Sequence, residues 1–172
     1  MFAVEIEIVG DDHEPVPPGT VGLLRYRGPG VATSYFGADA ASGDGFRDGW
    51  FYPGDIAEKN EAGYVFIRGR AKDVIIRGGI NIYAAEGESV LSAHPAVVES
   101  AVVGRRSRLM GEEVAAFVVL REPADPEELA GWCRERLAPY KVPRDFLAVE
   151  GLPKNSAGKV LKADLAAGLE AL

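Results

Sequence analysis

Hydrophobic and polar positions alternate in short runs over residues 1–71, and none of these runs has the spacing of a helix. Alternation with a period of two is typical of a strand with one buried face, and it predicts strands at residues 4–8, 22–27, 55–58 and 64–68. The last two are predicted to form a hairpin whose turn passes through Asn60 and Gly63. A polar segment with glycines, residues 38–48, predicts a loop. No helix is expected before Ala84, so this part is predicted to be all-β.

The rest of the chain mixes apolar runs with segments of helical spacing. Apolar runs bounded by polar turns predict strands at residues 74–76, 80–83, 97–103 and 114–120. Helices are predicted at residues 85–93, from Pro126 onward and at residues 162–172. Asp125 is suited to cap the second helix, and Cys133 falls on its apolar face, which predicts a core position. We therefore predict an α+β fold: a β-rich subdomain over residues 1–71, then a small domain over residues 72–172 with a short central sheet flanked by helices.

Composition narrows the class of protein. The 172 residues are 47% hydrophobic and 26% charged, as in a soluble globular protein. The longest uncharged apolar stretch is far shorter than the ~20 residues that span a bilayer, and the start lacks the cationic flank of a secretory signal. One cysteine permits neither an internal disulfide nor a thiolate metal cluster. The net charge of −7 argues against nucleic acid as a partner, and we expect a cytoplasmic protein without a transmembrane segment.

Two groups of residues carry candidate chemistry. The first is Gly49-x-x-x-x-Gly54-Asp55, followed by Arg70. A carboxylate on a turn that contains glycine can accept hydrogen bonds from two vicinal hydroxyls, as on a ribose. A nearby guanidinium can hold ribose oxygens or a phosphate. The alternative is an ordinary turn aspartate, with an arginine that pairs on the surface with Asp73 or Glu86.

The second group is the segment Pro153-Lys154-Asn155-Ser156-Ala157-Gly158-Lys159. A lysine beside a glycine on a polar loop can deliver a positive charge to a phosphate or a carboxylate. The segment is not a Walker A loop, because Pro stands at position 153 and Val160 replaces the required Ser or Thr. Taken alone, Lys159 could equally be an ordinary lysine that precedes a helix.

In order and spacing, three motifs resemble the adenylate-forming acyl-CoA synthetase superfamily, which binds AMP. They are Gly49-Trp50-Phe51-Tyr52-Pro53-Gly54-Asp55, Gly69-Arg70-Ala71-Lys72-Asp73-Val74-Ile75-Ile76-Arg77-Gly78-Gly79 and Leu152-Pro153-Lys154-x-x-x-Gly158-Lys159. The match covers essentially the whole chain and resembles the C-terminal portion of a fatty-acid or acyl-CoA ligase. It implies the last β-rich subdomain of the large adenylating lobe, followed by the complete mobile small domain.

The resemblance implies roles in the formation of an acyl-adenylate from ATP and a carboxylic acid. Asp55 stands where the family binds the ribose hydroxyls of ATP and acyl-AMP, and Arg70 matches an arginine that supports the same ribose. Lys159 matches the catalytic lysine that contacts the carboxylate and the α-phosphate. Because the attack brings two anions together, a cation that contacts both lowers the barrier.

The resemblance also implies a second half-reaction that forms acyl-CoA. Lys72 falls at the hinge about which the small domain turns between the two half-reactions. Gly78 and Gly79 match a glycine pair whose backbone lines the pantetheine tunnel after the rotation. ATP, Mg²⁺ and CoA are therefore the expected cofactors of the complete enzyme. The two histidines, His13 and His94, lack metal-ligand partners in the sequence, so we predict no metal held by this chain.

Several residues depart from the family or leave alternatives open. Pro53 stands where the family usually has Thr, which removes a hydroxyl contact but leaves Asp55 in place. Gly87 stands where the family has a buried apolar residue, so looser packing of that helix is expected. Three arginines share one predicted loop: Arg105, Arg106 and Arg108. They could meet the phosphates of CoA, or could be solvated and balance nearby glutamates.

The family's phosphate loop, its adenine- and magnesium-contacting segment and its acyl pocket all precede the position of Met1. The resemblance therefore implies a missing N-terminal adenylating lobe as partner, and we expect this chain alone to be inactive. A truncated synthetase and a naturally short protein both remain open, and the start within a strand favours truncation. Two other functions also remain: part of a peptide-synthetase adenylation domain, or a non-catalytic binding or regulatory module that keeps only the small-domain fold.

Overall fold

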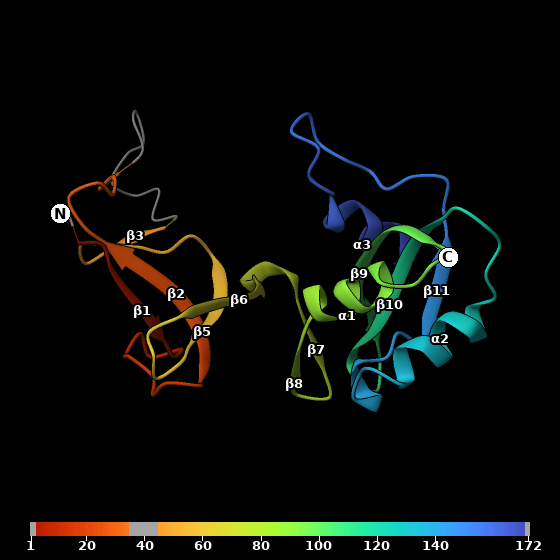
Figure 1. The fold of residues 1–172 in the computed structure, drawn as a ribbon, viewed down its shortest axis with the longest axis horizontal. Helices are drawn as coiled ribbons and strands as arrows, with labels where there is room; N and C mark the ends of the chain where they lie inside the picture. Colours follow the sequence, from red (N-terminus) through yellow and green to blue (C-terminus); the bar gives the residue numbers. More distant parts are fainter. Residues whose placement is uncertain (1–2, 35–44, 171–172) are drawn as a thin grey trace. The chain divides into compact units, whose positions relative to one another are not determined.

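Two compact units follow one another along the chain, Met1–Lys72 and Asp73–Leu172 (Figure 1). The structure is a computed structural model that describes residues 3–34 and 45–170. The first unit is built from strands, and the second from strands and helices, so the chain has the predicted α+β class.

The first unit is an antiparallel sheet in which β2 is the central strand. Its strands are β1 (Glu5–Val9), β2 (Val21–Arg27), β3 (Phe46–Arg47), β4 (Trp50–Phe51), β5 (Asp55–Lys59) and β6 (Val65–Arg70). Strand β2 pairs with β1, β4 and β5, and β6 pairs with β5. The predicted hairpin between β5 and β6 is confirmed: Asn60 Oδ1 accepts from the Tyr64 N–H at 2.9 Å, and Gly63 turns the chain with φ +85°.

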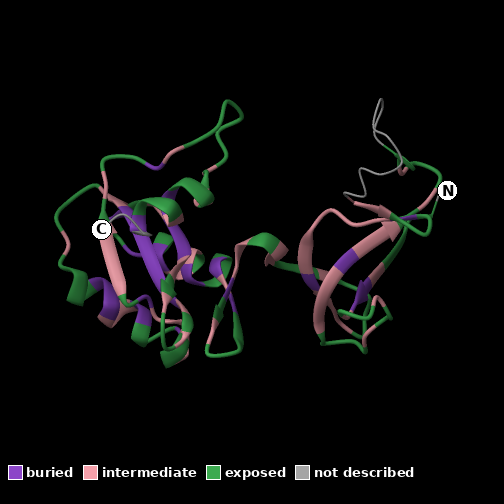
Figure 2. Cartoon of the chain, turned by 180° about the vertical axis from the view of Figure 1, so that it is seen from behind, coloured by how far each residue is buried: buried purple, intermediate pink, exposed green. Residues whose placement is uncertain are grey.

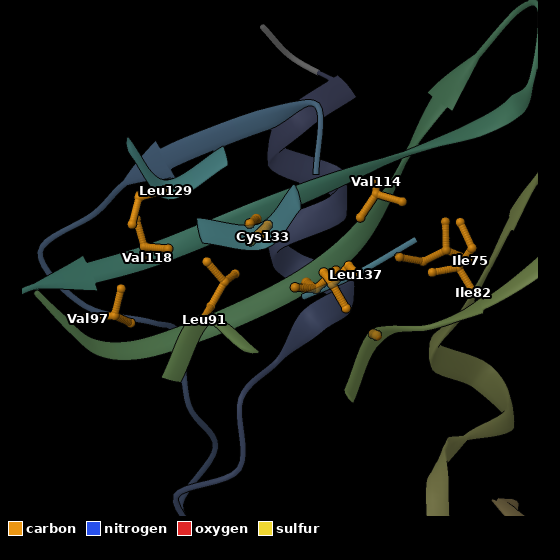
Figure 3. Close-up of a cluster of buried hydrophobic side chains, with 12 residues drawn as sticks. Ile75, Ile82, Leu91, Val97, Val114, Val118, Leu129, Cys133 and Leu137 are labelled. Carbon is orange, nitrogen blue, oxygen red and sulfur yellow. The ribbon is translucent and has the colours of Figure 1, made fainter. Parts of the chain in front are cut away.

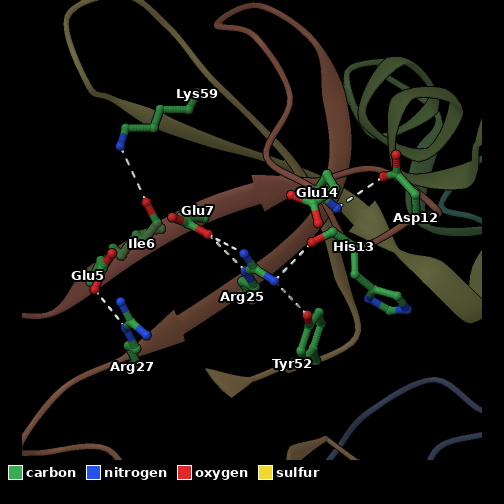
Figure 4. Close-up of polar contacts among 10 residues, drawn as sticks. All are labelled: Glu5, Ile6, Glu7, Asp12, His13, Glu14, Arg25, Arg27, Tyr52 and Lys59. Atoms are coloured by element: carbon green, nitrogen blue, oxygen red, sulfur yellow. Dashed lines mark hydrogen bonds and ion pairs between the residues drawn. The ribbon is translucent and has the colours of Figure 1, made fainter. Parts of the chain in front are cut away.

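Polar contacts hold β1 and β2 together (Figure 4). The Arg25 guanidinium on β2 lies 2.5 Å from Glu7 on β1 and donates to the Tyr52 hydroxyl at 3.0 Å. Arg27 and Glu5 form the next ion pair along the same two strands, at 2.7 Å. Beneath the sheet, the buried cluster in the described residues is small, with Ile8, Leu24 and Ala57 as its fully buried members.

Two expectations for this unit need correction. Residues 38–44 of the predicted loop lie outside the described residues, but Phe46–Arg47, within the same predicted loop, form strand β3. A 3₁₀ turn, η1 (Ala71–Asp73), also precedes Ala84, where no helix was expected. Both elements are only two or three residues long, which is too short for a hydrophobic period to develop.

The second unit surrounds one sheet with helices. Its strands are β7 (Val74–Arg77), β8 (Ile80–Tyr83), β9 (Val97–Ser107), β10 (Gly111–Leu120) and β11 (Asp145–Ala148). Its helices are α1 (Ala84–Ser92), α2 (Pro126–Arg134), the 3₁₀ turn η2 (Pro139–Lys141) and α3 (Lys162–Glu170). Strands β9 and β10 form a long antiparallel hairpin, β11 runs parallel to β10, and β7 pairs with both β8 and β10.

Strand β10 divides its side chains between two cores. Val114, Ala116 and Val118 face a cluster that includes Leu91 of α1 and Leu129 of α2 (Figure 3). The intervening residues Ala115 and Phe117 face a second cluster, to which α3 contributes Leu165 and Leu169. Buried residues are accordingly concentrated in β9 and β10 (Figure 2). From Val114 to Leu120 this strand is apolar because both of its faces are covered.

Helix α2 begins and packs as the sequence predicts. Asp125 Oδ1 accepts from the Glu127 N–H at 2.7 Å, which satisfies one of the exposed donors at the helix start. Cys133 is fully buried in the first cluster, and burial raises the pKa of its thiol. Residues 171–172 of the predicted terminal helix lie outside the described residues.

The expected loose packing at Gly87 is wrong. Gly87 is buried, and a Cβ built there would lie 3.3 Å from Val102 Cγ2 on β9. Helix α1 therefore approaches the sheet closely at this position, and glycine permits that approach. None of the helices in the described part of the chain is long and apolar enough to cross a membrane.

Candidate functional site

Asp55 and Arg70 lie opposite one another in the first unit. Asp55 is the first residue of β5 and Arg70 the last of β6, and the two are direct partners across the hairpin. Arg70 Nη1 donates to Asp55 Oδ1 at 2.6 Å and to the Pro53 carbonyl at 3.2 Å. The Ala71 N–H donates to the Gly54 carbonyl at 2.9 Å, so the backbone on both sides of the pair is fixed.

The sequence left Asp73 and Glu86 open as surface partners of Arg70, whereas the structure pairs Arg70 with Asp55. The carboxylates of Asp73 and Glu86 lie instead against Lys162 and Lys141. The Asp55 side chain remains 23% exposed, and the hydrogen bond from Arg70 Nη1 is to its Oδ1. The arrangement can orient a carboxylate while leaving its other oxygen open to a hydroxyl donor.

The segment around Lys159 forms a tight turn before α3. Asn155 organises it: the Asn155 Oδ1 accepts from the N–H groups of Ala157 and Lys159, at 3.0 and 2.9 Å. Gly158 adopts φ +78°, a conformation that residues with a Cβ rarely adopt, and its N–H donates to the Asn155 carbonyl. Lys154 and Val160 bridge the base of the turn. The backbone at Lys159 is therefore well defined, although its side chain is exposed.

The six lysines differ in whether their ammonium groups have partners. Lys141, Lys154 and Lys162 form ion pairs at 2.6 Å with Glu86, Glu99 and Glu88, and Lys59 donates to the Ile6 carbonyl. Among the described residues, the ammonium groups of Lys72 and Lys159 have no hydrogen-bond or ion-pair partner. An unpaired ammonium can bind an external anion without first breaking an internal ion pair.

Gly78 and Gly79 form the turn between β7 and β8, with φ values of +59° and +82°. The turn rests against the turn between β9 and β10. The Gly78 N–H donates to the Met110 carbonyl at 2.7 Å, and a Cβ at Gly78 would lie 2.7 Å from Met110 Cε. A Cβ at Gly78 would therefore require the end of the Met110 side chain to move, whereas at Gly79 no atom lies within 4 Å of a Cβ position.

Two motifs of the second unit lie at its opposite ends. Figure 1 shows the turn between β7 and β8 at one end and the loop that leads into α3 at the other. The turn between β7 and β8 and the loop that leads into α3 are thus on two separate parts of the second unit. The structure brings Asp55 together with Arg70, but it does not bring the glycine pair together with Lys159.

The three arginines are not in one loop, which corrects the sequence prediction. Arg105 and Arg106 belong to β9, and Arg108 lies in the turn that follows. Arg105 pairs with Asp145 at 3.1 Å rather than with a neighbouring glutamate.

The sequence reasoning missed the buried Glu113, which lies 2.6 Å from Arg77 and 3.6 Å from Arg144. A charged residue directly before a fully apolar run was the only available signal. Within residues 3–34 and 45–170, no group of three or more His, Cys, Asp or Glu side chains is placed to hold a metal ion.

Comparisons with known proteins give this geometry a context. Residues 86–159 match the family described as the AMP-binding enzyme C-terminal domain. A 2-succinylbenzoate–CoA ligase of Bacillus velezensis is 41% identical over 162 residues, which are 94% of this chain and 33% of the ligase. The chain spans about a third of the length of the curated relatives it matches.

Solved structures agree with the sequence comparison. The o-succinylbenzoate CoA synthetase of Bacillus subtilis, in complex with its acyl-adenylate intermediate, has a TM-score of 0.90 and 39% identity. That match covers 94% of this chain and 33% of the synthetase. The same enzyme in complex with ATP and a magnesium ion gives a TM-score of 0.88 at 39% identity, over 94% of this chain and 34% of that one. Residues 86–159 therefore match the AMP-binding enzyme C-terminal domain, and nearly the whole chain is similar to about a third of these acyl-CoA ligases.

Proposed function

We propose that the chain is the C-terminal part of an ATP-dependent acyl-CoA ligase, which forms acyl-AMP and then acyl-CoA. The observation that carries the proposal is the separation of two motifs at opposite ends of the second unit, the unpaired Lys159 and the Gly78-Gly79 turn. A domain that serves two successive half-reactions needs two such surfaces. In this proposal residues 1–71 are the β-rich end of the large lobe, and residues 72–172 are the mobile small domain.

In the first half-reaction, Lys159 would place its ammonium between the carboxylate of the acid and the α-phosphate of ATP. The two anions repel each other, and a cation shared between them stabilises the charge that develops as they join. Asp55 would accept hydrogen bonds from the ribose hydroxyls through its oxygen other than Oδ1. Arg70 would keep that carboxylate correctly oriented.

In the second half-reaction, the small domain would turn about Lys72 and replace Lys159 with the Gly78-Gly79 turn. Lys72 lies in the short turn η1, where a few backbone dihedrals can absorb a rotation. The turn exposes backbone with no side chain at Gly79, so the pantetheine arm of CoA could pass close to it. The thiol would then attack the acyl-adenylate and release AMP.

The described residues fit ATP and CoA as substrates but offer no ligand group for Mg²⁺. No step is therefore assigned to Mg²⁺ through this chain. The phosphate loop and the acyl pocket belong, in this proposal, to an N-terminal adenylating lobe that acts as the partner.

Replacement of Lys159 tests the catalytic assignment. In the complete ligase, formed by the chain with its adenylating lobe, we expect Lys159→Ala to lower acyl-adenylate formation by ~10²–10³, as for loss of one charge-stabilising group. Pyrophosphate release measures this step. Lys154→Ala is the matched control, because Lys154 lies on the same turn but pairs with Glu99. Adenylation that Lys159→Ala leaves unchanged would refute the assignment.

Pyrophosphate release also tests the need for a partner, and acyl transfer to a thiol tests which acceptor the ligase uses. We expect the chain alone to release no pyrophosphate and to become active when the large lobe is added. A stable protein partner with no nucleotide response would favour the non-catalytic module. Transfer of the acyl group to a carrier-protein thiol, but not to CoA, would favour the peptide-synthetase adenylation domain.

A further inference from the structure

A second lysine, Lys162, joins three parts of the second unit. Its Nζ lies 2.6 Å from Glu88 Oε1 on α1 and 3.8 Å from Asp73 Oδ2 in η1. The same Glu88 oxygen accepts from the Val102 N–H of β9 at 2.8 Å. Lys162 is the first residue of α3, three positions after Lys159. One side chain therefore links the start of α3 to α1, to the sheet and to the residue that follows Lys72.

The burial of this cluster distinguishes it from a surface ion pair. The side chains of Lys162, Glu88 and Asp73 are 20%, 23% and 17% exposed. The pair formed by Lys154 and Glu99, on the same turn, has exposures of 38% and 39%. Partly buried charges are screened less by water and salt than exposed ones, and a carboxylate already fixed by a backbone N–H loses less side-chain entropy on pairing. Lys162 is therefore the better anchored of the two lysines.

The anchor lies at the base of the Lys159 turn. The Leu161 N–H donates to the Pro153 carbonyl at 2.8 Å, which closes the loop directly before Lys162. Beyond this point the turn is held by its own hydrogen bonds through Asn155 and by the exposed pair between Lys154 and Glu99, while Leu152 and Val160 at its two ends pack in the second cluster. The first residue of α3 adds the polar anchor of the turn to this apolar packing.

We propose that Lys162 is a positioning residue for adenylation: through Glu88 and Asp73 it holds the Lys159 turn and the end of the hinge in one rigid body. When the small domain turns about Lys72, Lys159 then arrives at a fixed place. The proposal rests on the proposed function, because it assigns Lys162 an effect through Lys159. Lys162 itself touches no substrate in this account.

Hydrogen exchange in the 172-residue chain tests the anchor without any activity. We expect Lys162→Met to raise amide exchange at Ala157, Gly158 and Lys159 by about tenfold, and Lys162→Arg to restore protection, because arginine keeps the charge and the reach. Lys154→Met is the control, expected to change exchange at these amides less than twofold. Unchanged exchange in Lys162→Met overturns the proposal.

The half-reactions of the complete ligase test the consequence. We expect Lys162→Met to lower kcat for adenylation ~10- to 100-fold with KM for ATP nearly unchanged, since misplacement of a catalytic group affects the transition state most. Acyl transfer to CoA from preformed acyl-adenylate should change less than twofold. Equal losses in both half-reactions indicate a merely structural role and overturn the proposal.

A second variant covers the case in which Lys162→Met fails to fold. Glu88→Gln keeps an oxygen acceptor for the Val102 N–H but removes the charge that Lys162 pairs with, and the same split between half-reactions is expected. If Lys159→Ala leaves adenylation unchanged while Lys162→Met still raises exchange in the turn, the proposed function fails and the anchor stands. If Lys159→Ala abolishes adenylation and Lys162→Met does not affect it, the positioning role fails alone.

Discussion

The two units of the chain are stabilised in different ways. The buried cluster described in the first unit has three members, and ion pairs such as the one between Arg25 and Glu7 join its strands. The second unit has two apolar clusters, one on each face of its sheet. Those cores lie between the sheet and the helices, whereas Gly78, Gly79 and Lys159 are on turns outside both clusters. In the first unit, Asp55 and Arg70 are themselves among the interactions that hold two strands together.

Each unit contains one tryptophan, so the comparison can be measured unit by unit. Trp50 lies in β4 of the first unit, and Trp132 lies in α2 of the second. The fluorescence of single-tryptophan variants, Trp50→Phe and Trp132→Phe, then reports each unfolding transition separately. We expect the first unit to unfold at the lower denaturant concentration, because it buries less apolar surface.

The largest effect on stability is expected in the two apolar clusters of the second unit. Leu91 is fully buried in the first cluster of the second unit, and Leu91→Ala should lower its free energy of unfolding by ~2–5 kcal/mol. The transition reported by Trp132 should shift, while the one reported by Trp50 stays in place. Equal shifts of both transitions would mean that the two units unfold together, and the comparison would fail.

A smaller effect is expected at the glycine turn. Gly78→Ala forces a Cβ into both a positive φ and the Met110 methyl group, and should cost about 1–3 kcal/mol. Gly79→Ala is the matched control, since it meets only the backbone strain and should cost about 1 kcal/mol. Met110→Ala combined with Gly78→Ala should recover the steric part of the loss. Thermal unfolding of the four variants measures these differences, and a Gly78→Ala variant no less stable than Gly79→Ala would contradict the steric account.

The smallest effect on stability is expected at the candidate ribose site. Arg70 is 40% exposed, so Arg70→Met should lower the stability of the first unit by less than about 1 kcal/mol. Its effect on the affinity of the complete ligase for ATP should be clearly larger, as measured by calorimetry. A variant with lower stability and unchanged ATP affinity would assign Arg70 to the hairpin alone.

Hydrophobic periodicity predicts most of the regular elements correctly. The runs at residues 97–103 and 114–120 become β9 and β10, and Asp125 caps α2 as its position suggests. Strand β11 was missed because its four residues show no clear period and it is paired only by β10. The predicted arginine loop was wrong because β9 continues past its apolar part to Ser107, and polar residues there still pair with β10.

The candidate site is less accessible to sequence reasoning than the fold. The motifs identify Asp55, Arg70 and Lys159, but the partner of Arg70 follows from cross-strand register, which local sequence does not reveal. That Lys159 is unpaired while Lys154 is paired depends on Glu99, which lies 55 residues from Lys154 along the chain. Lys162 is even farther from Glu88 and Asp73 along the chain, and no sequence pattern predicts their ion pairs.

The strict alternation along β10 makes its alignment with β9 all-or-none. A shift of one residue would move Val114, Ala116 and Val118 into the space beneath α3, and would place Phe117 beneath α1 and α2. Both cores would be misfilled at once, since large and small side chains would exchange places. A strand that faces solvent on one side can tolerate an inserted residue by bulging outward, but both faces of β10 are covered by a buried cluster. Single-residue insertions and deletions should therefore be far more damaging in this strand than in the exposed turns that contain Gly79 and Lys159.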